Sequence, residues 1–137
     1  MSTANRKPRC PWCLVNDKMI HYHDTEWGVP VHDDNKLFEF IVLGAFQAGL
    51  SWKTVLNKRE NFCRAFDGFN PEKAARYGNI QRNRLLNDAG IIRNRQKIEA
   101  AINNARTFLK IREKYGSFDS YIWSFTGAKT IHNKWKN

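Results

Sequence analysis

The segment of residues 10–28, CPWCLVNDKMIHYHDTEWG, concentrates side chains that can bind metals, carry redox chemistry or stack on flat ligands. Cys10 and Cys13 are followed by His21 and His23, so four candidate ligands for tetrahedral zinc lie close together in sequence. The two histidines are closer to each other than zinc ligands usually are. A redox dithiol would need a βαβ context, which is not visible here. The third interpretation is that the segment lines a pocket.

Large aromatic side chains occur where helices are expected to begin or end, outside the helical stripes. Trp12, Trp27 and Trp52 occupy such positions, and Tyr22 and Phe46 lie nearby in sequence. Aromatic walls can stack on an extruded base, and they attract a cationic guest by roughly 0.5 to 2 kcal/mol per ring. Each ring alone is better explained as part of a hydrophobic core. The cluster as a whole favours a base-binding pocket.

The segment LLNDAGIIRNRQKI predicts two helices joined by a tight hairpin at residues 89–91. Gly90 tolerates the positive φ that such a turn needs, and the next helix is expected to begin near Arg93. Free amides at a helix N-terminus bind phosphate, and Arg93 and Arg95 flank this one. The hairpin could also be an ordinary αα-hairpin. The local charge favours a clamp that grips the DNA backbone without reading bases.

The net charge of +10 attracts phosphate backbones or acidic membrane surfaces. The charge is uneven, because residues 82–114 contain nine basic side chains against the three acidic ones, Asp88, Glu99 and Glu113. This concentration favours a nucleic-acid partner over a merely solubilising surface.

These side chains must be positioned by helices, because apolar residues recur at helical spacing and no period of two is visible. Asp33, Ser51 and Ser117 are expected to cap helices, and Gly49 and Gly116 to end them. The expected helices cover residues 35–49, 52–66, 71–78, 79–90, 93–116 and 118–125. We therefore expect an all-α helical bundle over residues 9–137, with a disordered N-terminus at residues 1–8 and the hairpin at about 83–105.

The composition and the two ends of the sequence indicate the cellular compartment and the extent of the chain. Residues 1–10 lack the apolar stretch of a secretory signal, and no apolar run is long enough to span a membrane. Three cysteines do not make a disulfide framework, so a reducing cytoplasm is the simplest compartment. Trp135, two residues from a polar end, suggests missing packing partners and hence a truncated chain.

Four segments resemble, in order, the 3-methyladenine DNA glycosylase I family of the helix-hairpin-helix superfamily. They are RCPWC, IHYHDTEWGVPVHDDNKLFEF, FQAGLSWKTVLNKRENF and DAGIIRNRQKI. The resemblance implies a bacterial, monomeric base-excision repair enzyme with a helix-hairpin-helix glycosylase fold. Such an enzyme flips 3-methyladenine out of double-stranded DNA and hydrolyses its N-glycosidic bond, without nicking the strand.

The resemblance also assigns roles to single residues. It places Trp12, Tyr22, Trp27 and Trp52 in the base-binding pocket, with Trp52 as the main stacking ring. It places Gly90, Ile91, Ile92 and Arg93 on the DNA backbone, and Cys10 and His23 as the first two ligands of a structural zinc ion.

Two features depart from the family pattern. The family's other two zinc ligands, a His and a Cys, lie further towards the C-terminus than Asn137, which leaves half a zinc site and strengthens the expectation of truncation. The family's base-recognising Glu corresponds to Gly44, so this chain has no acid at the family's catalytic position. The resemblance assigns no role to Glu26 or Glu39. A DNA-binding module without catalysis and an inactive fragment therefore remain alternatives to the enzyme.

Overall fold

The computed structural model describes residues 7–136, and these form an all-α fold without strands. Its helices are α1 (Asp17–Thr25), α2 (Asp34–Phe46), α3 (Trp52–Asn57), α4 (Arg59–Ala65), α5 (Pro71–Ala75), α6 (Asn79–Leu86), α7 (Arg95–Tyr115) and α8 (Phe118–Ser124), with short 3₁₀ helices η2 (Pro11–Cys13) and η3 (Asp67–Phe69). The predicted fold class is confirmed. The disorder predicted for residues 1–8 falls mostly outside the described residues; Lys7 and Pro8 are exposed and lie outside any helix.

The helix boundaries follow the predicted caps. The side chains of Asp33, Ser51 and Ser117 each accept a hydrogen bond from the backbone N–H three residues on, at the starts of α2, α3 and α8. Gly49 and Gly116 follow the ends of α2 and α7, and their φ values are +78° and +85°. Residues other than glycine rarely adopt such positive φ values.

Two helix predictions were incomplete. The single helix expected over residues 52–66 is wrong, because Lys58 separates α3 from α4. The Lys58 amide bonds to the Val55 carbonyl, three residues back, and this tighter turn starts α4 in a new direction. Helix α1 was not assigned from the sequence, although Asn16 caps it by accepting a bond from the Met19 amide.

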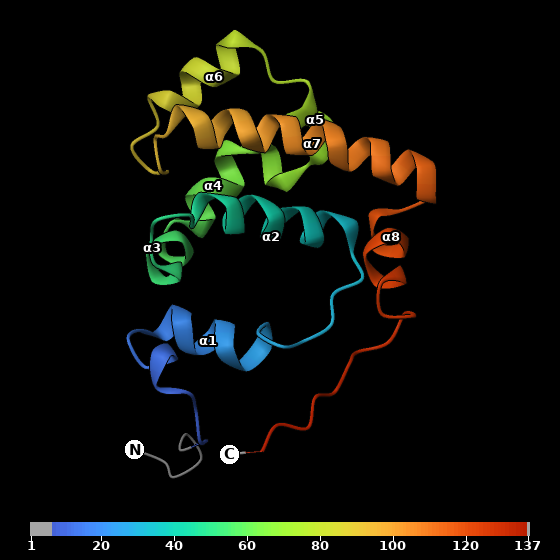
Figure 1. Cartoon of the computed structure of the whole chain (residues 1–137). Helices are drawn as coiled ribbons and strands as arrows, with labels where there is room; N and C mark the ends of the chain where they lie inside the picture. Colours follow the sequence, from blue (N-terminus) through green and yellow to red (C-terminus); the bar gives the residue numbers. More distant parts are fainter. Residues whose placement is uncertain (1–6, 137) are drawn as a thin grey trace.

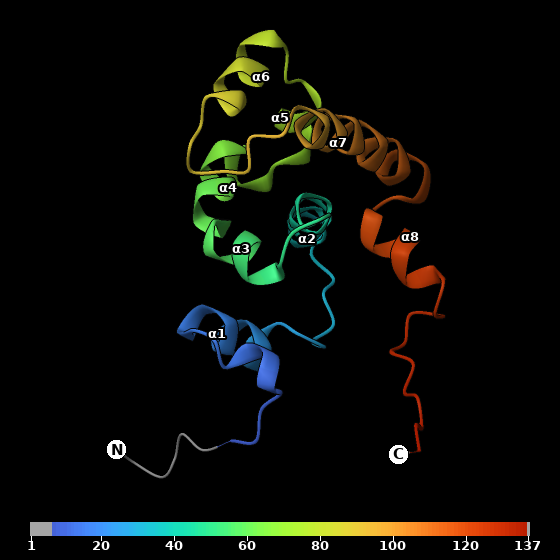
Figure 2. The same cartoon turned by 60° about the vertical axis from the view of Figure 1, so that its left-hand side comes forward.

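The bundle is organised around α2. Figure 1 shows α7 running along one side of α2, with α4 and α5 between α6 and the centre, and Figure 2 shows α2 end-on with α3 and α4 on one side and α8 on the other. The largest fully buried side chains come mainly from these helices and include Phe38, Phe46, Phe62, Phe66 and Phe108. This core fixes where α2 and α3 end.

A second, smaller cluster attaches α1 to α3. It consists of Cys13, Met19 and Leu56, with Tyr22 and Trp52 partly buried against it. Both views place α3, the last turn of α2 and the loop between α6 and α7 at the same end of the bundle (Figures 1 and 2). That end therefore carries both the aromatic segment and the predicted hairpin.

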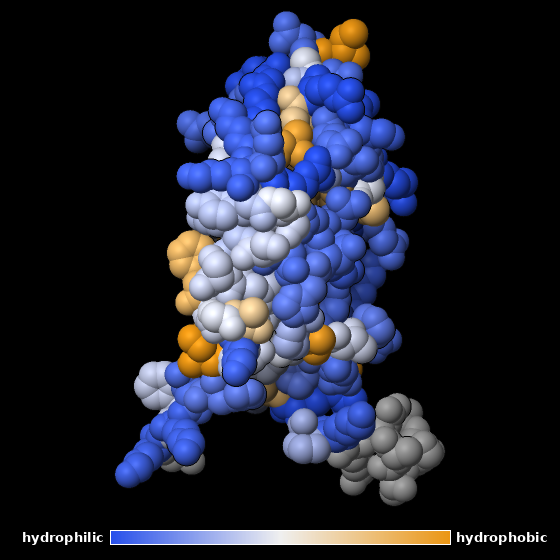
Figure 3. Space-filling model, turned by 90° about the vertical axis from the view of Figure 1, so that its right-hand side faces the viewer, coloured by the Kyte–Doolittle hydropathy of each residue, from blue (hydrophilic) through white to orange (hydrophobic). Residues whose placement is uncertain are grey.

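The opposite side carries α8 and the C-terminal segment, whose surface is mostly hydrophilic with separate hydrophobic spots (Figure 3). Trp135 in that segment is 86% exposed. Within residues 7–136, no helix is both long and apolar enough to cross a membrane.

Candidate functional site

A cavity of about 350 Å³ opens between α1, α2 and α3, and its walls are mostly aromatic. All four residues predicted to bind a base lie on it: Trp12 from η2, Tyr22 from α1, Trp27 just after α1, and Trp52 at the start of α3. The remaining wall comes from α2 and its C-cap and consists of Phe40, Gly44 and Gln47. The structure therefore brings the predicted rings together beside the residue at the family's acid position.

The rings contact one another around the cavity. The centroids of Trp12 and Trp27 lie 5.2 Å apart at 78°, and those of Tyr22 and Trp52 lie 5.3 Å apart at 53°. Trp12 also faces Tyr22 at 6.3 Å. Tilted and edge-on pairs of this kind keep rings in place and leave flat faces open to a guest.

Trp52 links the cavity to the interior. Ser51 caps α3 and so fixes the backbone of Trp52, which is the first residue of the helix. The ring packs against both hydrophobic clusters. Its Nε1 is buried and has no hydrogen-bond partner within the described part of the chain. A buried donor without a partner is costly, so this indole is held by its packing.

Tyr22 is suited to donate a hydrogen bond into the cavity. Burial, followed by the nearby Glu26 carboxylate, raises the pKa of its hydroxyl above the ordinary value, and Arg59 opposes the shift. Tyr22 therefore keeps its proton at neutral pH, and its O–H remains available to an acceptor on the edge of a base.

The two carboxylates without an assigned role are already paired, in a polar cluster behind the cavity. Arg59 donates to Glu26 at 2.6 and 2.7 Å and to Glu39 at 2.7 and 3.3 Å. Lys36 lies 3.5 Å from Glu26 and 3.2 Å from Glu39. Hydrogen bonding to Arg59 holds the pKa of Glu26 below its ordinary value. Neither carboxylate lines the aromatic cavity.

The half-site predicted for zinc has one feature that fits a metal ligand. The Nδ1 of His23 lies 2.9 Å from Asp24, and Arg9 donates to the same carboxylate. Hydrogen bonds from Arg9 and His23 hold the pKa of Asp24 well below its usual range. A carboxylate on one ring nitrogen typically orients a histidine whose other nitrogen binds metal.

The described residues do not complete a zinc site. No group of three or more His, Cys, Asp or Glu side chains among residues 7–136 is arranged to hold a metal ion. The four residues of the local alternative, Cys10, Cys13, His21 and His23, are not gathered around one point. The Cys13 thiol is buried and donates to the Cys10 carbonyl, and His21 lines a different hollow together with Arg59 and Glu60.

The hairpin loop differs in detail from its prediction. Helix α7 begins at Arg95, two residues later than expected, and Asn94 caps it by accepting from the Lys97 amide. Gly90 does not have the predicted positive φ. A Cβ on Gly90 would instead lie 3.0 Å from Asp88 Oδ1 and 3.1 Å from Asn61, so a larger residue would require these two side chains to move.

Two contacts hold this loop against the rest of the bundle. Asn61 in α4 donates to the Gly90 carbonyl at 3.0 Å, and the Gly90 amide donates to Asp88 at 2.8 Å. The backbone amides of Ile92 and Arg93 make no hydrogen bond to any described residue. Ile91 is buried in the core, Ile92 is partly buried and Arg93 is exposed. The loop thus offers two backbone donors beside an exposed guanidinium.

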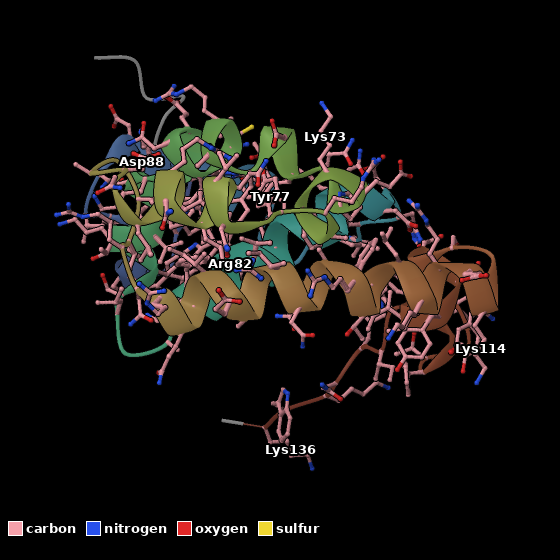
Figure 4. All side chains as sticks on the ribbon, turned by 90° about the horizontal axis from the view of Figure 1, so that it is seen from above. Lys73, Tyr77, Arg82, Asp88, Lys114 and Lys136 are labelled. Atoms are coloured by element: carbon pink, nitrogen blue, oxygen red, sulfur yellow. The ribbon has the colours of Figure 1, made fainter. Side chains whose placement is uncertain are left out.

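Most of the basic residues in the α6–α7 region are engaged within the protein. The Arg82 side chain extends from α6 and pairs with Glu99 of α7, whereas Lys114 lies at the far end of α7 from Asp88 (Figure 4). Lys97 donates to the carbonyls of Phe46 and Ala48 at 2.8 and 2.6 Å. Other side chains of the region, Arg84, Arg106 and Arg112, contact Tyr77, Ala75 and Glu72. Within the described residues, the Arg93 and Arg95 side chains make no hydrogen bond, ion pair or cation–π contact, and both are exposed beside the loop.

Sequence reasoning missed several residues of this region. Phe40 and Gln47 line the cavity, whereas Phe46, considered with the aromatic cluster, belongs to the core. The helical period could have separated these residues, because Phe40, Gly44 and Gln47 are spaced by four and three positions on one face of α2. Arg59 and Asn61 gave no such signal, since their partners are distant in sequence.

A second apolar hollow, of about 390 Å³, lies between α2 and α8. Its lining includes Val29, Leu37 and Trp123. The Trp123 indole donates to the Val31 carbonyl at 2.9 Å and its ring stacks on His32. The hollow contains none of the residues predicted to bind a base.

Comparisons with known proteins identify the family to which the chain belongs. Residues 12–137 match the family described as methyladenine glycosylase. The chain is 50% identical over 117 residues to DNA-3-methyladenine glycosylase 1 of Escherichia coli, covering 85% of this chain and 63% of that protein. It is 44% identical over 125 residues to DNA-3-methyladenine glycosylase of Haemophilus influenzae, covering 91% and 68%.

A solved structure gives the same result. The chain superposes with a TM-score of 0.84 and 38% identity on 3-methyladenine DNA glycosylase I from Staphylococcus aureus, whose structure addresses 3-methyladenine recognition. That match covers 88% of this chain and 64% of the other. The chain thus spans about two thirds of the length of the proteins it matches. The family match over residues 12–137, together with these relatives, shows that the chain belongs to the methyladenine glycosylase family.

Proposed function

We propose that the chain is a DNA N-glycosylase of base-excision repair that removes 3-methyladenine and similar alkylated, cationic purines from duplex DNA. It flips the damaged base out of the helix and hydrolyses the N-glycosidic bond, leaving an abasic site and an intact strand. The observation that carries this proposal is the single aromatic cavity that unites Trp12, Tyr22, Trp27 and Trp52 in a chain of this family.

The chemistry fits a cavity without acidic side chains. Alkylation at N3 places a positive charge on adenine, which makes the base a good leaving group and reduces the need for acid catalysis. The protein's task is then to select, extrude and orient the base. Trp52 stacks on it, the other rings attract its charge, and the Tyr22 hydroxyl and Gln47 amide bond to its edge.

The hairpin loop supplies the contact with the DNA backbone. The free amides of Ile92 and Arg93, in the loop that is held in place through Gly90 and Ile91, donate to phosphate oxygens, and the Arg93 side chain adds charge. Because the cavity and the loop lie at the same end of the bundle, one DNA molecule can reach both.

Zinc remains part of the proposal in a limited form. Cys10 and His23 contribute two ligands of a structural site, supported by the Asp24 contact that orients the His23 ring. Within residues 7–136, no third His, Cys, Asp or Glu side chain lies where it would join Cys10 and His23 in holding a metal ion. A structural zinc ion would tie η2 to α1 and thereby steady Trp12 and Tyr22.

The proposed partner is double-stranded DNA that contains alkylated adenine, and the proposed setting is a bacterial cytoplasm with the protein acting as a monomer. The three cysteines are unpaired, which suits a reducing compartment.

The alternative function is DNA binding without excision. Gly44 favours it, because the cavity lacks a carboxylate that could pair with a cationic base. A protein of this kind would hold damaged DNA through its loop and leave the glycosidic bond intact.

The two functions are separated by an excision assay on duplex DNA treated with a methylating agent. We expect release of free 3-methyladenine and abasic sites that break only under alkali. Trp52→Ala should lower the excision rate at least tenfold and change DNA affinity less than about threefold, because it removes stacking and leaves the loop. Trp135→Ala, at an exposed ring, is the matched control. DNA binding without base release would favour the alternative.

A further inference from the structure

Gly44 has no backbone reason to be glycine. It lies in the interior of α2, where glycine is disfavoured relative to alanine. Its φ is not positive, so any residue could adopt its conformation.

Packing does not require a glycine at this position either. A Cβ on Gly44 would meet no atom within 4 Å, whereas a Cβ on Gly90 would meet Asp88 at 3.0 Å. Gly44 is exposed and is part of the lining of the aromatic cavity, so the space beside it opens to the cavity and to solvent. Because Gly44 has no side chain, the cavity is larger next to this part of α2.

The rest of the lining determines what this space can receive. Five rings, those of Trp12, Tyr22, Phe40, Trp27 and Trp52, surround it, and Gln47 is the neighbouring polar side chain. The nearby carboxylates of Glu26 and Glu39 are bonded to Arg59 and line other hollows. The space beside Gly44 is thus roomy, apolar and uncharged.

We propose that the space beside Gly44 receives the alkyl substituent of the bound purine, so that the site accepts substituents larger than methyl. This inference rests on the proposed function, since it assumes that the aromatic cavity holds the base. The base is selected by stacking and by apolar burial of the substituent instead of by a charge pair. Each further buried methylene should strengthen binding about fourfold.

The test is a titration of free 3-methyl-, 3-ethyl- and 3-propyladenine, followed by quenching of tryptophan fluorescence. We expect affinity to rise with substituent length for the unaltered chain. Gly44→Leu fills the space with a good helix former and should lower 3-propyladenine affinity at least tenfold, and 3-methyladenine affinity less than about threefold. Asn35→Leu, which introduces the same leucine at an exposed position of α2 outside the cavity lining, should leave the series unchanged.

The outcomes are distinct. Tighter binding of 3-methyladenine than of its longer homologues, or equal losses for all three bases in Gly44→Leu, would overturn this inference and leave the proposed function standing. Quenching by none of the bases would refute both. Thermal melting of each variant shows whether a loss of binding comes from unfolding.

Discussion

The two glycines of the site, Gly44 and Gly90, differ in the space around them. A Cβ on Gly44 would meet no neighbouring atom, whereas a Cβ on Gly90 would press on the side chains of Asp88 and Asn61. The close approach of Asp88 and Asn61 to Gly90 lets the Asn61 amide reach the Gly90 carbonyl. Gly90 therefore sets the distance between the hairpin loop and α4. Its role is to allow close packing, which differs from the positive φ predicted from the sequence.

Replacing Gly90 with alanine tests this role. Gly90→Ala forces a methyl group against Asp88 and Asn61, and overpacking of this kind costs roughly 1–3 kcal/mol of unfolding free energy. We expect the loop to shift and the affinity for undamaged duplex DNA, measured by fluorescence anisotropy, to fall at least fivefold. Quenching by 3-methyladenine should change little, because the cavity is formed by other elements.

Gly78→Ala is the matched control, since a Cβ at Gly78 meets only the Gln81 side chain, at 3.8 Å. Unchanged DNA affinity in Gly90→Ala, despite a lowered melting temperature, would mean that the loop does not contact DNA.

At the scale of elements, Arg59 joins three helices behind the cavity. It begins α4, and its partners are Glu26 at the end of α1 and Glu39 in α2. Glu26 immediately precedes Trp27, so this network also fixes one wall of the cavity. Removing one partner of a partly buried ion pair leaves uncompensated charge, which costs more than the pair itself contributes.

Arg59→Leu should accordingly destabilise the fold by roughly 3 kcal/mol at neutral pH, measured by urea unfolding. The folded-state pKa of Glu26 is lowered from 4.5, so its stabilising effect is complete above that value and is lost as the pH falls further. The difference between Arg59→Leu and the unaltered chain should therefore shrink in acid.

Arg112→Leu provides the comparison, because the Arg112–Glu72 pair is more exposed and should contribute less than about 1 kcal/mol. If the two variants lose equal stability, or if the Arg59→Leu difference does not depend on pH, the network does not hold these helices together.

The elements that the sequence predicts well are those whose signals are local. Asp33, Ser51 and Ser117 cap helices through bonds to amides three residues away, and such pairs are visible in the sequence. The break at Lys58 and the polar helix α1 were missed, because tertiary contacts decide them more than helical period does.

The site divides in the same way. The aromatic residues could be chosen from their types and from the family resemblance, and they do share a cavity. Phe40 and Gln47 needed the orientation of α2, and the partners of Arg59 and Asn61 needed the fold. Sequence spacing cannot reveal pairs that lie 29 or 33 positions apart.

At the scale of the whole molecule, hydrogen bonds connect the helix that follows the hairpin loop to the end of α2 beside the cavity. Lys97, near the start of α7, donates to the carbonyls on either side of Gln47, which lines the cavity. Other basic side chains, such as Arg106, also make internal contacts, and the exposed Arg93 and Arg95 lie beside the loop. The Lys97 contacts thus tie the aromatic cavity to the helix that follows the hairpin loop.

The central claim, that this cavity receives the base, is tested most directly by NMR titration of the ¹⁵N-labelled chain with 3-methyladenine. We predict that the indole signals of Trp12, Trp27 and Trp52 shift together with the Gly44 amide, whereas those of Trp123 and Trp135 stay in place. Shifts confined to Trp123, in the hollow between α2 and α8, would place the base elsewhere and contradict the account.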